Sequence, residues 1–268
     1  MTAFEQIAVP TRQDKPRSSG ITMMIDWGIP LGQQKDILQA QGHLVDSAKI
    51  AAGIPRFMPT ELLKQKLAAY RTADISTANG GLFTELTLKQ GTYDSMLAEL
   101  AEVGFDAVEI SENLMPLSTV AKTEAVRHAR ENYGLKVLGE VGRKEGEMTD
   151  DEIIEDVEIY LNAGADSVYL EAAEIFEGDQ ARDALIRRLM ENFPIDALVF
   201  ELPVNIIPSI TDAIKHKMAS KMVAELGTEV NLANVEYYEV YLLECLRRGL
   251  GGDTNHAQGA FRLAGIGG

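Results

Sequence analysis

Four glutamates along the chain each stand near the end of an apolar run, at intervals of about 30 residues: Glu109, Glu140, Glu171 and Glu201. Converging carboxylates have two common uses, because they bind a hard cation such as Mg²⁺ or exchange protons with a substrate. The alternative is structural, with each glutamate paired to a lysine or arginine. Because the position recurs four times, we favour function. We predict a Mg²⁺ site that includes at least two of Glu140, Glu171 and Glu201, and we count Glu109 among the catalytic candidates.

Three cations could accompany these carboxylates. Lys49 lies among apolar residues, including Ala48 and Ile50, and a buried lysine must be paired or lose its proton. It is therefore either a structural partner of one glutamate or a cation that acts on the substrate. Arg143 and Lys144 directly follow one of the glutamate-bearing strands. They are either solvated loop charges or groups that bind the substrate and donate a proton to it, and we predict that Arg143 binds and that Lys144 donates.

Asp26 ends the first apolar run, and Gly80 and Gly81 follow a weak strand. Backbone N–H groups of such a glycine pair can hold an anion, although the pair is also typical of an ordinary turn. We predict that all three residues contribute to substrate binding. The sequence contains no P-loop, no zinc-ligand spacing and no G-x-S-x-G motif.

Apolar runs and amphipathic segments alternate along the chain. We expect strands at 21–26, 44–50, 74–78, 105–111, 135–141, 166–171, 197–201 and 229–232, and helices at 33–41, 59–70, 92–103, 118–133, 149–162, 180–193, 208–226 and 237–249. Eight strand–helix units predict a single closed (β/α)8 TIM barrel, whose active site lies at the C-terminal ends of the strands. A doubly wound open sheet is the alternative, but there is no G-x-G-x-x-G fingerprint.

The predicted organisation is an irregular leader at 1–20, the barrel at 21–255 and a flexible C-terminal tail at 256–268. The net charge of −16 disfavours nucleic acid and anionic membranes as partners. A small anionic substrate then needs local cations. The single cysteine excludes an internal disulfide and, with no signal peptide and no membrane-spanning run, predicts a cytoplasmic protein. We also expect a homo-oligomer.

Several strings resemble the phosphosulfolactate synthase family. They are Lys15–Asp26, Val45–Lys49, Gly80–Gly81, Gly104–Ser111, Val137–Gly142, Gly164–Asp166, Phe200–Glu201, Val230–Asn234 and Leu246–Thr254. The resemblance implies an (α/β)8 barrel and a Mg²⁺-dependent addition of sulfite to phosphoenolpyruvate, the first step of one coenzyme M route. It also implies that Lys144 is the general acid and that Asn234 binds the substrate.

The chain departs from the family pattern at cationic positions. Trp27 stands where a lysine is usual, Ala173 and Gly251 stand where arginines are usual, and Val204–Ile207 replaces a run with a lysine. Each lost charge-assisted hydrogen bond is worth roughly 1.5–3 kcal/mol. Two alternatives to the synthase therefore remain: an enzyme of the same barrel with a less anionic enol or alkene substrate, and a non-catalytic member like a plant branch associated with heat stress.

Overall fold

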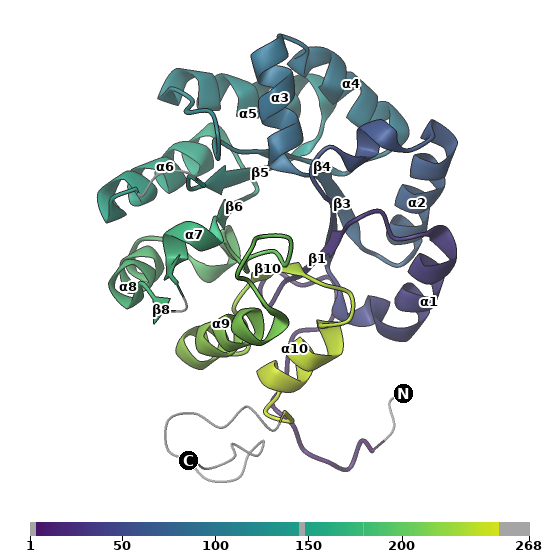
Figure 1. Ribbon diagram of the computed structural model, residues 1–268, viewed down its shortest axis with the longest axis vertical. Coiled ribbons are helices and arrows are strands. Elements are labelled where there is room, and N and C mark those ends of the chain that lie inside the picture. Colours follow the sequence, from purple (N-terminus) through teal and green to yellow (C-terminus); the bar gives the residue numbers. More distant parts are fainter. Residues whose placement is uncertain (1–3, 145–147, 179, 252–268) are drawn as a thin grey trace.

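Eight parallel strands close into one barrel in the computed structural model, which describes residues 4–144, 148–178 and 180–251. Their order around the barrel is β1-β10-β9-β6-β5-β4-β3-β2 (Figure 1). The strands are β1 Thr22–Asp26, β2 Ser47–Ile50, β3 Ser76–Asn79, β4 Ala107–Ile110, β5 Lys136–Val141, β6 Ser167–Leu170, β9 Leu198–Glu201 and β10 Leu232–Val235. The (β/α)8 barrel expected from the alternating pattern is confirmed, and the open sheet is wrong.

The helices surround the barrel (Figure 1). Those expected from the sequence are α1 Leu31–Gln41, α2 Thr60–Thr72, α4 Tyr93–Val103, α5 Thr119–Tyr133, α6 Asp150–Ala163, α8 Asp183–Asn192, α9 Asp212–Leu226 and α10 Val240–Arg247. Helix α4 shows how the pattern produces them. It buries Met96, Leu97, Leu100 and Val103 on one face, and Gly104 ends it with a left-handed φ of 103°.

The longest helix that was not expected from the pattern follows β3. The glycine pair begins α3 (Gly81–Gln90) instead of an isolated turn. Its buried residues include Thr84, Glu85 and Thr87, so the helix has no apolar stripe that a hydrophobic period could reveal. A short helix, α7 (Ala172–Ile175), and an antiparallel hairpin, β7 (Phe176–Glu177) with β8 (Gln180–Ala181), were also missed. The hairpin is the reason that the helix expected from residue 180 begins at Asp183.

The eighth strand was expected at 229–232 and lies at Leu232–Val235. The residues before it contact both the N-terminal segment and β9, since the Asn231 carbonyl accepts a hydrogen bond from the Phe200 amide at 2.9 Å. The Glu229 carbonyl accepts a hydrogen bond from the Gly20 amide at 2.8 Å, and the Asn231 side chain accepts one from the Ile21 amide at 2.8 Å. The pairing of this strand with β1 begins at Leu232, opposite Thr22.

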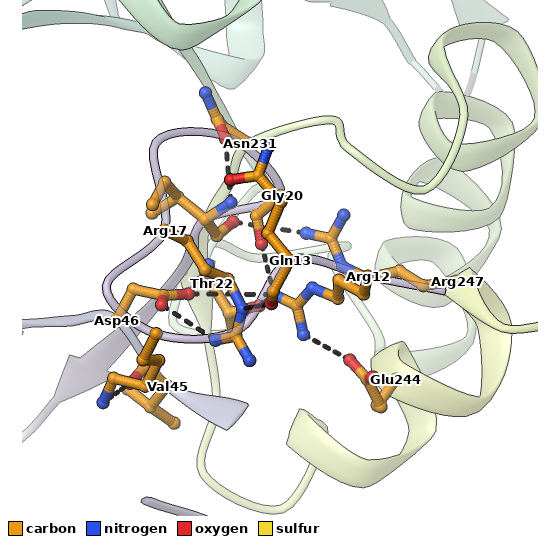
Figure 2. A network of polar contacts seen from close by, with 12 residues as sticks. Arg12, Gln13, Arg17, Gly20, Thr22, Val45, Asp46, Asn231, Glu244 and Arg247 are labelled. Atoms are coloured by element: carbon orange, nitrogen blue, oxygen red, sulfur yellow. Dashed lines mark hydrogen bonds and ion pairs between the residues drawn. The ribbon is translucent and has the colours of Figure 1, made fainter. Parts of the chain in front are cut away.

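The described part of the leader crosses the N-terminal end of the barrel. Arg17 forms an ion pair with Asp46 at 2.9 Å, and Arg12 is paired with Glu244 of α10 (Figure 2). The Lys15 ammonium donates to three backbone carbonyls, among them that of Val45 at 2.7 Å. The leader thus joins the first strand units to the last helix at the end opposite the glutamates. The tail predicted at 256–268 lies outside the described residues.

The main apolar core lies between the strands and the surrounding helices, and a smaller one fills the barrel with Met23, Leu138, Tyr169, Val199 and Ala233. Across the described ranges, no helix has the length and hydropathy needed to span a bilayer.

Candidate active site

The structure brings the predicted glutamates together at the C-terminal ends of neighbouring strands. Glu109 lies in β4, Glu140 in β5 and Glu201 in β9, while Glu171 directly follows β6. The four side chains are buried, with exposed fractions of 1–5%. Oxygens of Glu140, Glu171 and Glu201 lie within 4.8 Å of one another. We call these three residues the glutamate cluster.

Lys49 lies beside the cluster and is paired twice. Its ammonium is 2.6 Å from the Glu201 carboxylate and 2.9 Å from that of Glu109. Burial would lower the pKa of Lys49, but the surrounding carboxylates outweigh burial and raise it well above its ordinary value. Lys49 is therefore a charged structural partner of two glutamates, whichever further role it has.

The glycine pair supports Glu109. The amide N–H of Gly81, at the N-terminus of α3, donates to Glu109 Oε1 at 2.6 Å. A Cβ on Gly81 would lie 2.6 Å from Ser111 Cβ and 2.9 Å from a Glu140 oxygen, and one on Gly80 would lie 2.7 Å from the Ala52 amide nitrogen. The close approach of α3 to the site therefore requires glycine. The anion that the Gly81 amide holds is the protein's own carboxylate.

Negative charge is in excess at this mouth. Among the residues that the structure describes, the four glutamates face two ammonium groups, those of Lys49 and Lys144. Burial, followed by repulsion from neighbouring carboxylates, raises the pKa of Glu140 well above its ordinary value. Burial also raises the pKa values of Glu109 and Glu171. Such a site takes up either protons or a cation.

The glutamate cluster fits a divalent cation. Mg²⁺ takes oxygen ligands at about 2.1 Å, so oxygens on one ion lie at most about 4.2 Å apart. The cluster's oxygens already lie within 4.8 Å. Glu171 Oε2 is buried without a hydrogen-bond partner among the described residues, its one close cation being Lys144 at 3.5 Å. These three carboxylates are therefore the groups that would hold the ion.

Lys144 and Arg143 lie in the loop after β5. The Lys144 side chain is 34% exposed, and its ammonium is 3.5 Å from Glu171 Oε2. Burial would lower the pKa of Lys144, but the nearby carboxylates, Glu171 foremost, outweigh it and raise the pKa. Arg143 is half-buried, and its backbone N–H donates to Glu174 at 3.2 Å. The structure thus joins Lys144 directly to the cluster and places Arg143 beside it in the chain.

Asp26 is not brought to the cluster. It is fully buried and accepts hydrogen bonds from the amides of Gly28 and Ile29, both at 2.8 Å, and from the Tyr70 hydroxyl at 2.6 Å. Lys66 is paired with it at 2.6 Å. These four contacts use both oxygens of the Asp26 carboxylate. Its structural role is therefore to fix the loop after β1.

Asn234 has backbone φ of 59°, a left-handed value that asparagine tolerates better than most residues. Its amide donates to the Leu202 carbonyl at 3.1 Å, in the segment after β9. Its Oδ1 is buried with no hydrogen-bond partner in the part of the chain that the structure describes. An acceptor is therefore available there for a ligand or water molecule that donates a hydrogen bond.

Sequence reasoning missed the residues that hold the surrounding loops. Glu85 of α3 binds the loop after β4, and Glu174 of α7 accepts from the Arg143 and Met148 amides in the loop after β5. Asn113 donates to Glu140 at 2.8 Å. Glu174 had one signal, its place three residues after Glu171. Glu85 and Asn113 lie in segments whose structure the pattern did not predict.

The family model for (2R)-phospho-3-sulfolactate synthase (ComA) matches residues 10–253. Three proteins named phosphosulfolactate synthase are similar to this chain. The one from Methanocaldococcus jannaschii is 31% identical over 246 residues, with 88% of this chain and 93% of the relative covered. Those from Methanothermobacter thermautotrophicus and Bacillus subtilis are 29% and 26% identical, with 95% and 92% of this chain and 98% and 97% of the relatives covered.

Solved structures share the fold at low identity. The YdjI aldolase from Escherichia coli K12 matches with a TM-score of 0.51 and 14% identity over 82% of this chain and 76% of its own. The carboxyl transferase domain of Rhizobium etli pyruvate carboxylase matches with a TM-score of 0.53 and 12% identity over 82% of this chain and 40% of that one. These two matches bear on the barrel alone. The family match over nearly the whole described barrel, together with the 31% identical relative, shows that this chain belongs to the (2R)-phospho-3-sulfolactate synthase (ComA) family.

Proposed function

We propose that this protein adds sulfite to phosphoenolpyruvate to form phosphosulfolactate, with a divalent cation, Mg²⁺, on the glutamate cluster and with Lys144 as the proton donor. The observation that carries the proposal is the convergence of Glu140, Glu171 and Glu201 within 4.8 Å in a member of this family. Lys144 supports it because its ammonium lies 3.5 Å from the same cluster.

The reaction forms one carbon–sulfur bond and moves one proton. The sulfur lone pair of sulfite attacks C3 of the enol phosphate, and the C2–C3 π electrons move toward C2 and the carboxylate. The Lys144 ammonium donates a proton to C2 and is reprotonated from solvent. The raised pKa of Lys144 keeps it protonated at neutral pH, as a donor must be.

Bound Mg²⁺ would supply positive charge where the substrate carboxylate gains electron density. The three carboxylates of the cluster would hold it, and Lys49 would help to fix the position of Glu201 by pairing with it and with Glu109. Asn234 and Arg143 would contact the substrate. Arg143 supports this role with its place next to Lys144, and Asn234 would contact the substrate through a water molecule that donates to its free buried Oδ1.

The test is direct. Purified protein is incubated with phosphoenolpyruvate, sulfite and Mg²⁺, and the sulfonated product is sought by mass spectrometry. Omission of sulfite and addition of a chelator serve as controls. Product that depends on all three components supports the proposal, and its absence with folded protein contradicts it.

A second candidate is the same addition to a less anionic enol or alkene. Two observations favour it. Lys49 is already paired with two glutamates, which leaves Lys144 as the mouth's other ammonium group among the described residues. The loops after β4 and β9 expose apolar side chains, Leu114 at 60% and Ile206 at 69%. Parallel assays with sulfite and a simple 2-alkenoate such as crotonate separate the two candidates by their kcat/KM values.

A further inference from the structure

We propose that Asn113 is a positioning residue that fixes the Glu140 carboxylate and the Lys144 backbone relative to each other. The role deepens the function proposed above and rests on it, because Glu140 and Lys144 are the groups positioned. Asn113 lies in the loop between β4 and α5 and is 2% exposed.

Asn113 makes one contact to each side of the site. Its side-chain Nδ2 donates to Glu140 Oε1 at 2.8 Å, and its backbone carbonyl accepts from the Lys144 amide at 3.1 Å. The hydrogen bond from Asn113 fixes the position of Glu140 Oε1. Because the two oxygens belong to one planar carboxylate, it also fixes the direction in which Oε2 points. Partners that orient ligand side chains in this way tune the affinity of metal sites.

The loop that carries Asn113 is itself held by a buried carboxylate. Glu85 of α3 accepts from the backbone amides of Asn113 at 2.9 Å and of Leu114 and Met115 at 3.0 Å each. The Ser111 hydroxyl donates to the same carboxylate. Four hydrogen bonds to the buried Glu85 carboxylate hold the loop after β4 in place. Asn113 is therefore held in a fixed position relative to Glu140.

The amide oxygen of Asn113 is the third observation. Oδ1 is buried and has no hydrogen-bond partner among the described residues. A buried acceptor without a donor costs free energy, and such a cost is tolerated where a ligand supplies the donor. A water molecule carried by the cation is a donor of the right kind, so Asn113 would orient Glu140 through Nδ2 and receive that water through Oδ1.

The experiment compares Mg²⁺ binding by calorimetry, without substrate, in the wild type, Asn113→Leu and Asn113→Ala, well below their unfolding midpoints. Both variants remove the donor and the acceptor, and Asn113→Ala serves if Asn113→Leu does not fold. We expect the Mg²⁺ affinity to fall about 10–100-fold. The matched control is Asn231→Leu, because Asn231 is equally buried but donates to the Ile195 and Leu198 carbonyls at the opposite end of the barrel. The control should lower the unfolding midpoint and leave the affinity unchanged.

A metal-free crystal structure of the Asn113 variant that folds separates this inference from the proposed function. We expect the Glu140 carboxylate to rotate away from Glu171 and Glu201 once Asn113 is replaced. If the wild type binds no Mg²⁺, the metal in the proposed function is wrong, and the crystal structure still decides what Asn113 does. Wild-type affinity in a folded variant, or an unmoved Glu140 carboxylate, overturns the inference.

Discussion

The ammonium of Lys49 lies 2.6 Å from the carboxylate of Glu201, at the end of β9 and across the barrel mouth from β2. Both side chains are buried, and Lys49 also reaches Glu109 at 2.9 Å. The pair joins strands that are distant in sequence. The Lys49 ammonium offsets part of the negative charge of this acidic site.

Lys49→Met should destabilise the fold by about 3–5 kcal/mol, because it leaves two buried carboxylates without their cation. Urea unfolding at pH 7 measures the free energy of unfolding. The control is Lys64→Met, which removes an exposed pair with Glu102 at 4.0 Å and should cost less than about 1 kcal/mol. Equal effects of the two substitutions would show that the buried pair contributes little.

Glu140→Gln should stabilise the metal-free protein, and more so at pH 8 than at pH 5.5. The pKa of Glu140 is raised in the folded state, so the folded protein binds more protons than the unfolded chain above the ordinary value of 4.5. The contribution of Glu140 to the free energy of unfolding therefore falls as the pH rises. Glutamine does not ionise, so the variant does not lose stability in this way. Urea unfolding of both proteins across this range measures the difference. If the free energy of unfolding of the wild type rose relative to that of Glu140→Gln as the pH increased, the raised pKa of Glu140 would be contradicted.

Glu171→Gln should weaken Mg²⁺ binding by at least about tenfold, because the variant replaces a charged oxygen ligand with a neutral one. Calorimetry without substrate measures the affinity. Glu99→Gln on the exposed face of α4 is the matched control and should bind like the wild type. If Glu171→Gln retained the wild-type affinity, the cation would have to be held elsewhere.

Lys144→Ala should lower kcat for the proposed addition by about 10²–10⁴-fold and change KM less. Lys144→Arg should be nearly as damaging, because the arginine pKa is too high for an acid near neutral pH. Steady-state kinetics with sulfite and phosphoenolpyruvate measure both variants, and Lys35→Ala, on the surface of α1, is the control. If Lys144→Arg retained most of the activity, Lys144 would act through its charge and would not be the proton donor.

Gly81→Ala should destabilise the fold by about 1–3 kcal/mol, because the added methyl would lie 2.6 Å from Ser111 Cβ and must displace α3 or the loop after β4. The same displacement should weaken Mg²⁺ binding, since the Cβ also meets a Glu140 oxygen at 2.9 Å. Gly32→Ala is the control, because nothing lies within 4 Å of a Cβ there. It should be neutral or stabilising by about 0.4–1 kcal/mol. Equal unfolding free energies for the two variants would contradict the close packing.

The sequence by itself determined the barrel and the place of its acids. Each strand–helix unit carries its own hydrophobic period and its own stop signal, such as Gly104 after α4. Because these signals are local, they can be read without knowing which strands pair. Parallel strands also bring their C-terminal ends to one side, so Glu140, Glu171 and Glu201 had to converge once the barrel closed.

Only the tertiary structure decided which groups the acids contact. The partners of Glu201 and Glu140 are Lys49 and Asn113, which lie 152 and 27 residues away in the chain. Helix α3 is invisible to the hydrophobic period because it buries polar residues, Glu85 among them. Asp26, placed at a strand end like the glutamates, turned out to be occupied by Lys66 and Tyr70. Closure of the barrel sets these pairings, because it fixes distances between side chains that no local signal in the sequence relates.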